Sequence, residues 1–314
     1  MLRGRMKTAE ASDALESAYL SECDSHDKFY QSEWLKTIDF SLCSHAAMQV
    51  YDVLMTVISG RIAMPVLSVN DGEIFYEESG EGYPVLLFAP GFLGSRIERW
   101  RTNPSRPGVD QDWRDPIPVF TPHFRVISFD VRNAGSSRAS IGPDYSWSSY
   151  TADHLALLKH LGIARCHVMG GCIGVSFALA LEQAAPGTVS AQILQNPIGL
   201  SDTNRAAVDG EVAHWESTVA GRSDVDPALL KAAGERMFAT DFIFSVTREY
   251  AATSTVPTLL MPGDDTMHPV SVSADIARLT KAEVLAPWKG PKYRDAAIER
   301  ARDFLLEHTP EVSS

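Results

Sequence analysis

The sequence has few cysteines and no long apolar run. Its 314 residues include four cysteines, none of them in a Cys-x-x-Cys pair, which argues against a disulfide framework and against a zinc site. We therefore expect no metal and no cofactor, in a reducing cytoplasm. The most apolar early run, residues 48–58, is too short and too polar to span a bilayer. Residues 8–19 are too polar for the apolar core of a signal peptide.

Positive charge is also scarce. Lys and Arg number 28 against 40 Asp and Glu, which gives a formal net charge of -12. This acidic balance argues against nucleic acid and anionic membranes as partners. The composition is otherwise ordinary for a globular protein, and the length is sufficient for a full core. We expect a small-molecule substrate as the partner, and the sequence leaves open whether the chain forms a homo-oligomer.

One short segment indicates a nucleophile. Residues 170–174 read Gly-Gly-Cys-Ile-Gly and stand between an apolar run, 166–169, and an amphipathic helical stretch, 175–181. A strand that enters a helix through so sharp a turn needs small residues two positions before and after the central one. Cys172 is thereby placed at the helix N-terminus, where free N–H groups favour a thiolate. The pattern favours a reactive Cys172; the alternative is a small buried hydrophobic residue.

From Met64 onwards, short apolar strands alternate with helices. This pattern is typical of a mostly parallel sheet that is covered by helices on both faces. Residues 1–63 read as a helical N-terminal extension and residues 201–252 as a helical cap, so that 64–200 and 253–314 form the core. Eight strands are expected, at residues 65–69, 73–78, 84–88, 124–129, 166–169, 191–195, 258–261 and 283–286.

Several segments resemble landmarks of the α/β-hydrolase-fold superfamily, in its order. They are Ala89-Pro90-Gly91-Phe92, Asp130-Val131-Arg132-Asn133-Ala134-Gly135-Ser136, the turn at 170–174, and residues 257–265 followed by His268-Pro269. The resemblance implies an α/β-hydrolase fold with an eight-stranded, mostly parallel sheet and a helical cap insertion. It also implies an oxyanion hole made by the backbone N–H groups of Phe92 and Ile173. Asp265, or else Asp264, would be the acid, although consecutive aspartates can also cap a following helix.

No histidine stands where this superfamily places its base, just after the last strand. That stretch reads Pro-Trp-Lys-Gly-Pro at 287–291. His214 lies in the expected cap and could overhang the site, and the other histidines fall at unsuitable places except His268. His268 follows Asp265 by three residues on a loop at the carboxyl edge of the sheet, where active sites of open α/β sheets lie. We interpret His268 as the base; a turn-forming or substrate-binding role, or Lys289 as the base, are the alternatives.

Two functions of different class are consistent with these residues. The preferred one is an acyl hydrolase acting on a small ester, lactone or thioester through Cys172. The other is a protein that has lost hydrolysis and binds a ligand, or catalyses acyl transfer or carbon–carbon cleavage. The missing histidine favours the second, and the retained glycines of the turn favour the first. Rim residues that could line a pocket or pair with a substrate carboxylate are Trp100, Arg101, Arg106, Trp113, Trp215, Phe242, Phe244 and Arg248.

Overall fold

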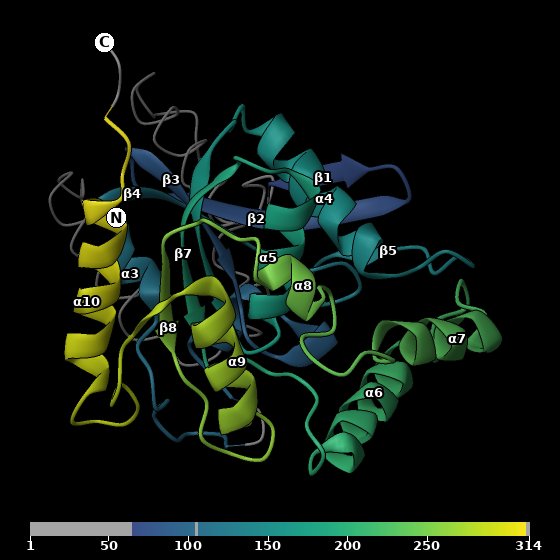
Figure 1. Ribbon diagram of the computed structural model, residues 1–314. Helices are drawn as coiled ribbons and strands as arrows, with labels where there is room; N and C mark the ends of the chain where they lie inside the picture. The colour runs from purple at the N-terminus through teal and green to yellow at the C-terminus, as the bar shows by residue number, and fades with distance from the viewer. Residues whose placement is uncertain (1–64, 104–105, 312–314) are drawn as a thin grey trace, which may run out of the picture. The chain divides into compact units, whose positions relative to one another are not determined.

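The computed structural model describes residues 65–103 and 106–311 (Figure 1). The expected helical extension at 1–63 lies outside these residues. In the described part of the chain, nine strands form one sheet. They are β1 (Val66–Val69), β2 (Gly72–Ser79), β3 (Tyr83–Phe88), β4 (Phe124–Phe129), β5 (Arg138–Ala139), β6 (Cys166–Gly171), β7 (Val189–Gln195), β8 (Thr258–Met261) and β9 (Glu283–Val284).

The order of the strands confirms the predicted α/β-hydrolase fold. Eight strands follow one path, β1-β2-β4-β3-β6-β7-β8-β9, and β5 pairs with β2 off this path. The pairs from β4 to β9 are parallel, whereas β1 and β2 pair antiparallel with their neighbours. The predicted count of eight is short by β5, since a strand of two residues, Arg138 and Ala139, carries no alternating apolar pattern.

Helices cover both faces of the sheet because its strands are apolar on both. In β3, Leu86 and Phe88 enter one buried cluster, and Val85 and Leu87 enter the other, as the period of two in a strand requires. The helical elements are η4 (Phe92–Gly94), η5 (Ile97–Trp100), α3 (Pro116–Phe120), α4 (Trp147–His160), α5 (Gly174–Ala184), α6 (Arg205–Val219), α7 (Pro227–Met237), α8 (Arg248–Ala251), α9 (Val270–Thr280) and α10 (Arg294–Glu307).

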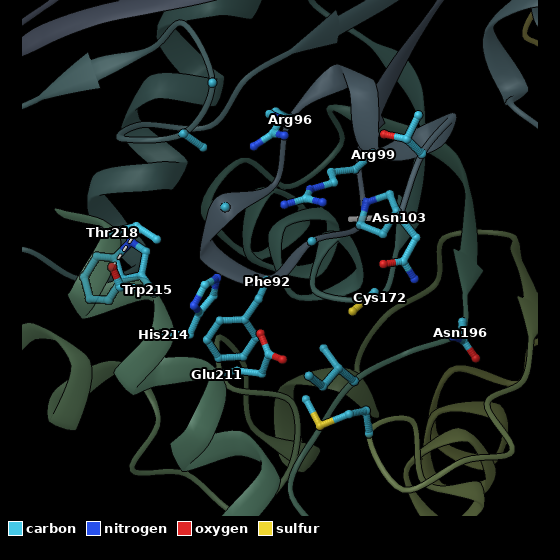
Figure 2. A pocket seen from close by; sticks show the side chains of 18 of the residues that line it. Phe92, Arg96, Arg99, Asn103, Cys172, Asn196, Glu211, His214, Trp215 and Thr218 are labelled. Atoms are coloured by element: carbon cyan, nitrogen blue, oxygen red, sulfur yellow. Dashed lines mark hydrogen bonds between the residues drawn. The ribbon is translucent and has the colours of Figure 1, made fainter. Parts of the chain in front are cut away.

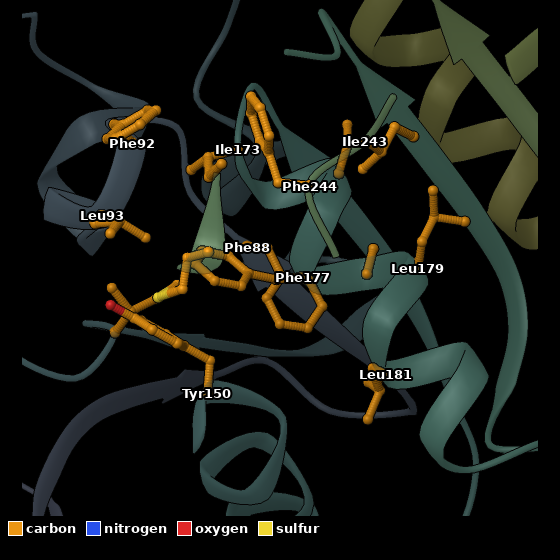
Figure 3. Packing of buried hydrophobic residues seen from close by; sticks show 14 of the residues in the cluster. Phe88, Phe92, Leu93, Tyr150, Ile173, Phe177, Leu179, Leu181, Ile243 and Phe244 are labelled. Atoms are coloured by element: carbon orange, nitrogen blue, oxygen red, sulfur yellow. The ribbon is translucent and has the colours of Figure 1, made fainter. Parts of the chain in front are cut away.

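The cluster on one face supports the turn before α5. Buried residues of α4, α5 and α9 belong to it, while those of α3 and α10 belong to the opposite cluster. Phe177 of α5 stacks on Tyr150 of α4 with 5.2 Å between ring centroids, and lies 6.2 Å from Phe88 (Figure 3). Aromatic side chains of this kind bury large apolar areas. The first turns of α5 are therefore held in place by packing against α4 and β3.

Along the chain, helices α6, α7 and α8 all follow β7 and precede β8. The segment after α7 packs on the core beside the carboxyl ends of the strands: Phe238 stacks on Phe92 with 4.7 Å between ring centroids, and the indole N–H of Trp147 donates to the carbonyl of Met237 at 2.8 Å. Figure 1 shows α6 and α7 extending beyond the sheet on that side. Residues of α6 line one side of the pocket described next.

Candidate active site

The turn between β6 and α5 presents Cys172. Its φ angle is 55°, in the left-handed region, which a non-glycine residue adopts at a cost that functional sites often bear. A Cβ on Gly170 would collide with the carbonyl of Gly174, and one on Gly174 with the carbonyl of Phe88. The backbone N–H of Cys172 donates to the carbonyl of Gln195 at 2.9 Å. The turn is thus held on both sides, and the thiol is partly exposed.

Asp265 and His268 meet on the loop between β8 and α9. The Nδ1 atom of His268 lies 2.8 Å and 3.0 Å from the two carboxylate oxygens of Asp265, and the His268 backbone N–H donates to the same carboxylate at 2.9 Å. Helix α9 has Pro269 at its N-cap and no side-chain cap, so the alternative in which these aspartates cap it is wrong. The carboxylate instead orients the imidazole.

The imidazole is also coupled to the thiol. The Nε2 atom of His268 is buried and has no hydrogen-bond partner of ordinary geometry among the described residues. Burial opposes protonation, but the charge of Cys172 and the hydrogen bond that His268 donates to Asp265 outweigh it and raise the pKa of His268 to about 9. The hydrogen bond from His268 in turn holds the pKa of Asp265 well below its usual range. The three groups form one electrostatic unit.

Lys289, the alternative base, contacts the acid instead. Its ammonium group forms an ion pair with Asp264 and lies 3.6 Å from the carboxylate of Asp265. No contact between Lys289 and Cys172 occurs among the described residues. The position that the superfamily gives to histidine is therefore occupied here by a cation that neutralises part of the charge of the two aspartates.

Two other histidines of the described chain are buried among packed side chains, and a third is exposed on the wall of the pocket. His154 is enclosed by Phe88, Phe129 and Phe177, and burial lowers its pKa to about 3. Burial likewise lowers the pKa of His167 to about 4. His214 is exposed on α6 and lines the pocket that contains Cys172.

Phe92 and Ile173 stand at the start of η4 and at the N-cap of α5. Backbone N–H groups in a first helical turn have no acceptor within the helix. Phe92 has a φ angle of 55° and directly follows Gly91, whose φ is 120°. This sharp backbone turn at the end of β3 directs the chain past Cys172, and both Phe92 and Cys172 line the same pocket.

That pocket has a volume of about 670 Å³. Figure 2 shows Cys172 with Arg99 and Asn103 on one wall and His214 and Trp215 of α6 on the other. Of the rim residues expected from the sequence, the pocket is lined by Arg106, Trp113 and Trp215. The remaining five lie elsewhere: Trp100 packs under Gly171, Phe242 and Phe244 are buried, Arg101 pairs with Asp115, and Arg248 pairs with Asp241 and Asp275.

Residues that sequence reasoning missed also line the pocket, chiefly Arg96, Arg99, Asn196 and Glu211. Arg96 and Arg99 belong to residues 95–118, a long segment after β3 whose high arginine content can be seen in the sequence. Which of its arginines face inward cannot be seen there, because the segment has no period that assigns an inner face.

Comparison with known proteins agrees with the fold. A family model described as the alpha/beta hydrolase fold matches residues 84–223. The RutD protein of Pseudomonas savastanoi pv. phaseolicola, named as a carbamate hydrolase, is 24% identical over 66% of this chain and 84% of its own length. A second RutD protein, of Pseudomonas syringae pv. syringae, is 34% identical, but over only 28% of this chain and 34% of its own length.

Solved structures are similar over a larger share of the chain. The enol-lactonase of Burkholderia xenovorans LB400 aligns with a TM-score of 0.55 at 20% identity, over 77% of this chain and 100% of that one. A thermophilic esterase of Thermogutta terrifontis aligns with a TM-score of 0.56 at 18% identity, over 78% and 100%. The fold and the turn at Cys172 define an α/β-hydrolase-fold protein. The likeness to these structures thus agrees with the α/β-hydrolase fold, which the family model matches over residues 84–223.

Among the described residues, no helix combines the length and the apolar character needed to cross a bilayer.

Proposed function

We propose that the protein hydrolyses a small ester, lactone or thioester, with Cys172 as nucleophile, His268 as general base and acid, and Asp265 as the carboxylate that orients it. The observation that carries this proposal is the position of His268: Nδ1 is fixed by Asp265, while Nε2 is left without a partner on the side coupled to Cys172. This is the arrangement of nucleophile, base and orienting acid that acyl transfer requires.

In the first step, the Cys172 thiolate attacks the substrate carbonyl and forms a carbon–sulfur bond. The oxyanion accepts hydrogen bonds from the backbone N–H groups of Phe92 and Ile173. The tetrahedral intermediate then expels the alcohol or thiol, which takes its proton from the Nε2 atom of His268. The products are a thioester on Cys172 and a free leaving group.

In the second step, water attacks the thioester and gives its proton to Nε2 of the now neutral His268. The carbon–sulfur bond breaks, and the carboxylic acid leaves. The net reaction consumes one water and yields one acid and one alcohol or thiol. Residues 201–252, with α6 on the pocket wall, act in this proposal as a cap that limits the size of the substrate. The activities named for the relatives, on a carbamate and an enol-lactone, support small acyl substrates.

The test is the hydrolysis of a neutral activated ester, 4-nitrophenyl acetate, together with intact-protein mass spectrometry. Cys172→Ala should abolish both turnover and the acetylated protein. His268→Gln should slow turnover by about 10²–10⁴-fold. If the deacylation step is slowed more than the acylation step, the acetyl-enzyme accumulates in this variant.

The matched control is His214→Gln, which removes an exposed histidine from the opposite wall of the same pocket and should leave turnover within about twofold. The proposal fails if the parent protein never carries the acetyl group, or if Cys172→Ala retains the parent rate. Either outcome would favour a ligand-binding protein that retains the fold.

A further inference from the structure

Arg99 is a cation in the wall of the pocket that contains Cys172. It lies in η5, and its side chain crosses the backbone of Gly91: a Cβ built there would lie 3.0 Å from Cγ and 3.3 Å from Nε of Arg99. Gly91 directly precedes Phe92, the residue to which the proposed function gives one oxyanion N–H. The side chain of Arg99 therefore lies against the residue that precedes Phe92, whose N–H group is proposed to bind the substrate carbonyl.

The guanidinium of Arg99 has no carboxylate partner. Its Nε atom is buried without a hydrogen-bond acceptor, and the group forms no ion pair with any described residue. A buried donor that lacks a partner costs free energy, and a charged one costs more than a neutral one. An arginine in this state can regain its hydrogen bonds from a ligand, and the planar fork suits a carboxylate.

Three of the other four arginines that line the pocket form ion pairs. Arg96 forms an ion pair with Glu98 at 2.9 Å, and Arg106 forms one with Asp112 at 3.1 Å. Arg222, at the end of α6, pairs with Asp224. The remaining arginine, Arg138, forms no ion pair with any described residue but is exposed to solvent. Arg99 is therefore the arginine of this pocket that combines a buried donor with the lack of a partner.

The surroundings of Arg99 have charges of both signs. Burial and then the charge of Arg96 lower the pKa of its guanidinium, while Glu98 and Glu211 act in the opposite direction. Glu98 is already paired with Arg96. Glu211 lies on α6 and lines the same pocket. An anion bound at Arg99 would meet a guanidinium that has no carboxylate partner among the described residues.

We propose that Arg99 binds a carboxylate of the substrate, so that the compounds hydrolysed carry a carboxylate a few bonds from the reacting carbonyl. This inference rests on the proposed function for the reacting carbonyl itself. It selects, within small esters, lactones and thioesters, those derived from short dicarboxylic or related acids.

The test uses two alkylating reagents that differ in charge. Iodoacetate and iodoacetamide both form a bond between the Cys172 sulfur and a carbon that loses iodide, but only iodoacetate carries a carboxylate. We expect Arg99→Met to lower the ratio of the iodoacetate rate to the iodoacetamide rate by about tenfold. Arg99→Lys, which retains the charge without the fork, should lower it less.

Arg106→Met is the control, since Arg106 lines the same pocket but is already paired with Asp112. Its ratio should stay within about twofold of the parent value. The inference is overturned if Arg99→Met leaves the ratio unchanged, or if Arg106→Met lowers it equally. The charge of His268 acts on all these variants alike and therefore cancels in the comparison.

A binding titration with glutarate separates this inference from the proposed function, because it needs no reactive thiol. The parent protein should bind glutarate, measured by calorimetry, and Arg99→Met should weaken that binding by about tenfold. If neither reagent alkylates Cys172, the proposed function fails, and the glutarate titration alone decides the role of Arg99. Absence of glutarate binding by the parent protein would overturn the inference.

Discussion

His268 has two ring nitrogens in different surroundings. Nδ1 is fixed by Asp265, and Nε2 is buried on the side that is coupled to Cys172. A neutral imidazole would need a proton on one nitrogen only, and the contact with Asp265 places it on Nδ1. Nε2 is then free to take up the proton of the thiol.

The pKa of His268 should depend on the thiol. In the parent protein we expect titration of this imidazole near pH 9, because the charge of Cys172 raises its pKa against the effect of burial. Cys172→Ala removes that charge and should lower the pKa, and Asp265→Asn should lower it as well. NMR titration of the His268 ring protons measures both changes. A pKa unaffected by Cys172→Ala would contradict the coupling.

The same shift makes folding stability depend on pH. The folded-state pKa of about 9 lies above the value of roughly 6.5 for an unperturbed histidine. The protonated imidazole therefore stabilises the folded state fully below pH of about 6.5, and this contribution is lost as the pH rises towards 9. The advantage of the parent protein over His268→Gln in free energy of unfolding should shrink over that interval, as urea titrations at several pH values would measure.

Single residues differ in how far the sequence can predict them. Cys172 is evident from its local pattern, because the turn that presents it needs glycine at fixed positions. The pairing of Asp265 with His268 is also local, at three residues of separation. Arg99 could not be predicted, because its lack of a partner depends on where Glu98 and Glu211 lie in the folded chain.

Among the connections between elements, the turn from β6 to α5 leaves little room for a larger side chain. A methyl group on Gly174 would meet the carbonyl of Phe88, which belongs to the neighbouring strand β3. We expect Gly174→Ala to lower the free energy of unfolding by about 3 kcal/mol, as overpacking of a rigid site does. It should also reduce alkylation of Cys172, since α5 must shift. Urea denaturation and alkylation rates are the measurements.

Gly210→Ala provides the contrast. Gly210 lies within α6, and a methyl group there would meet no other atom within 4 Å. Because alanine forms helices more readily than glycine, the free energy of unfolding of this variant should rise by about 0.5–1 kcal/mol. If both variants lost stability alike, the collision at Gly174 would not be the cause.

Elements that lie within an apolar run were predictable from the sequence, and elements without such a run were not. The eight expected strands and the helical stretch at 175–181, which lies within α5, follow from apolar or helical patterns. Strand β5 and the 3-10 helices η4 and η5 have two to four residues each, which is too few for a period to show. Tertiary contacts determine such elements.

For the molecule as a whole, a buried ion pair joins distant segments. Arg132, after β4, pairs with Asp153 of α4 at 2.8 Å and with Asp71 of the β1–β2 turn at 3.0 Å. Only 3% of the Arg132 side chain and 5% of the Asp153 side chain are exposed. Arg132→Met would leave a buried carboxylate unpaired, and we expect a loss of about 3–5 kcal/mol in free energy of unfolding, measured by urea denaturation.

The double variant Arg132→Met, Asp153→Leu removes both buried charges together. It should recover most of the loss, because well-packed apolar residues can replace a buried ion pair with little cost. A double variant as unstable as the single one would mean that packing, rather than the unpaired charge, is responsible. The sequence gives no sign of this ion pair, whose partners are separated by 21 and 61 residues.

The loop between β8 and α9 carries both the acid and the base of the proposed mechanism. Its two backbone hydrogen bonds join Asp265 and His268 in both directions, and Gly263 closes the turn so tightly that a Cβ there would strike His268. Acid and base are therefore held together by the backbone of one short loop. A single insertion in this loop of eight residues, 262–269, would displace both groups at once, whereas changes after β9 would leave their mutual geometry intact.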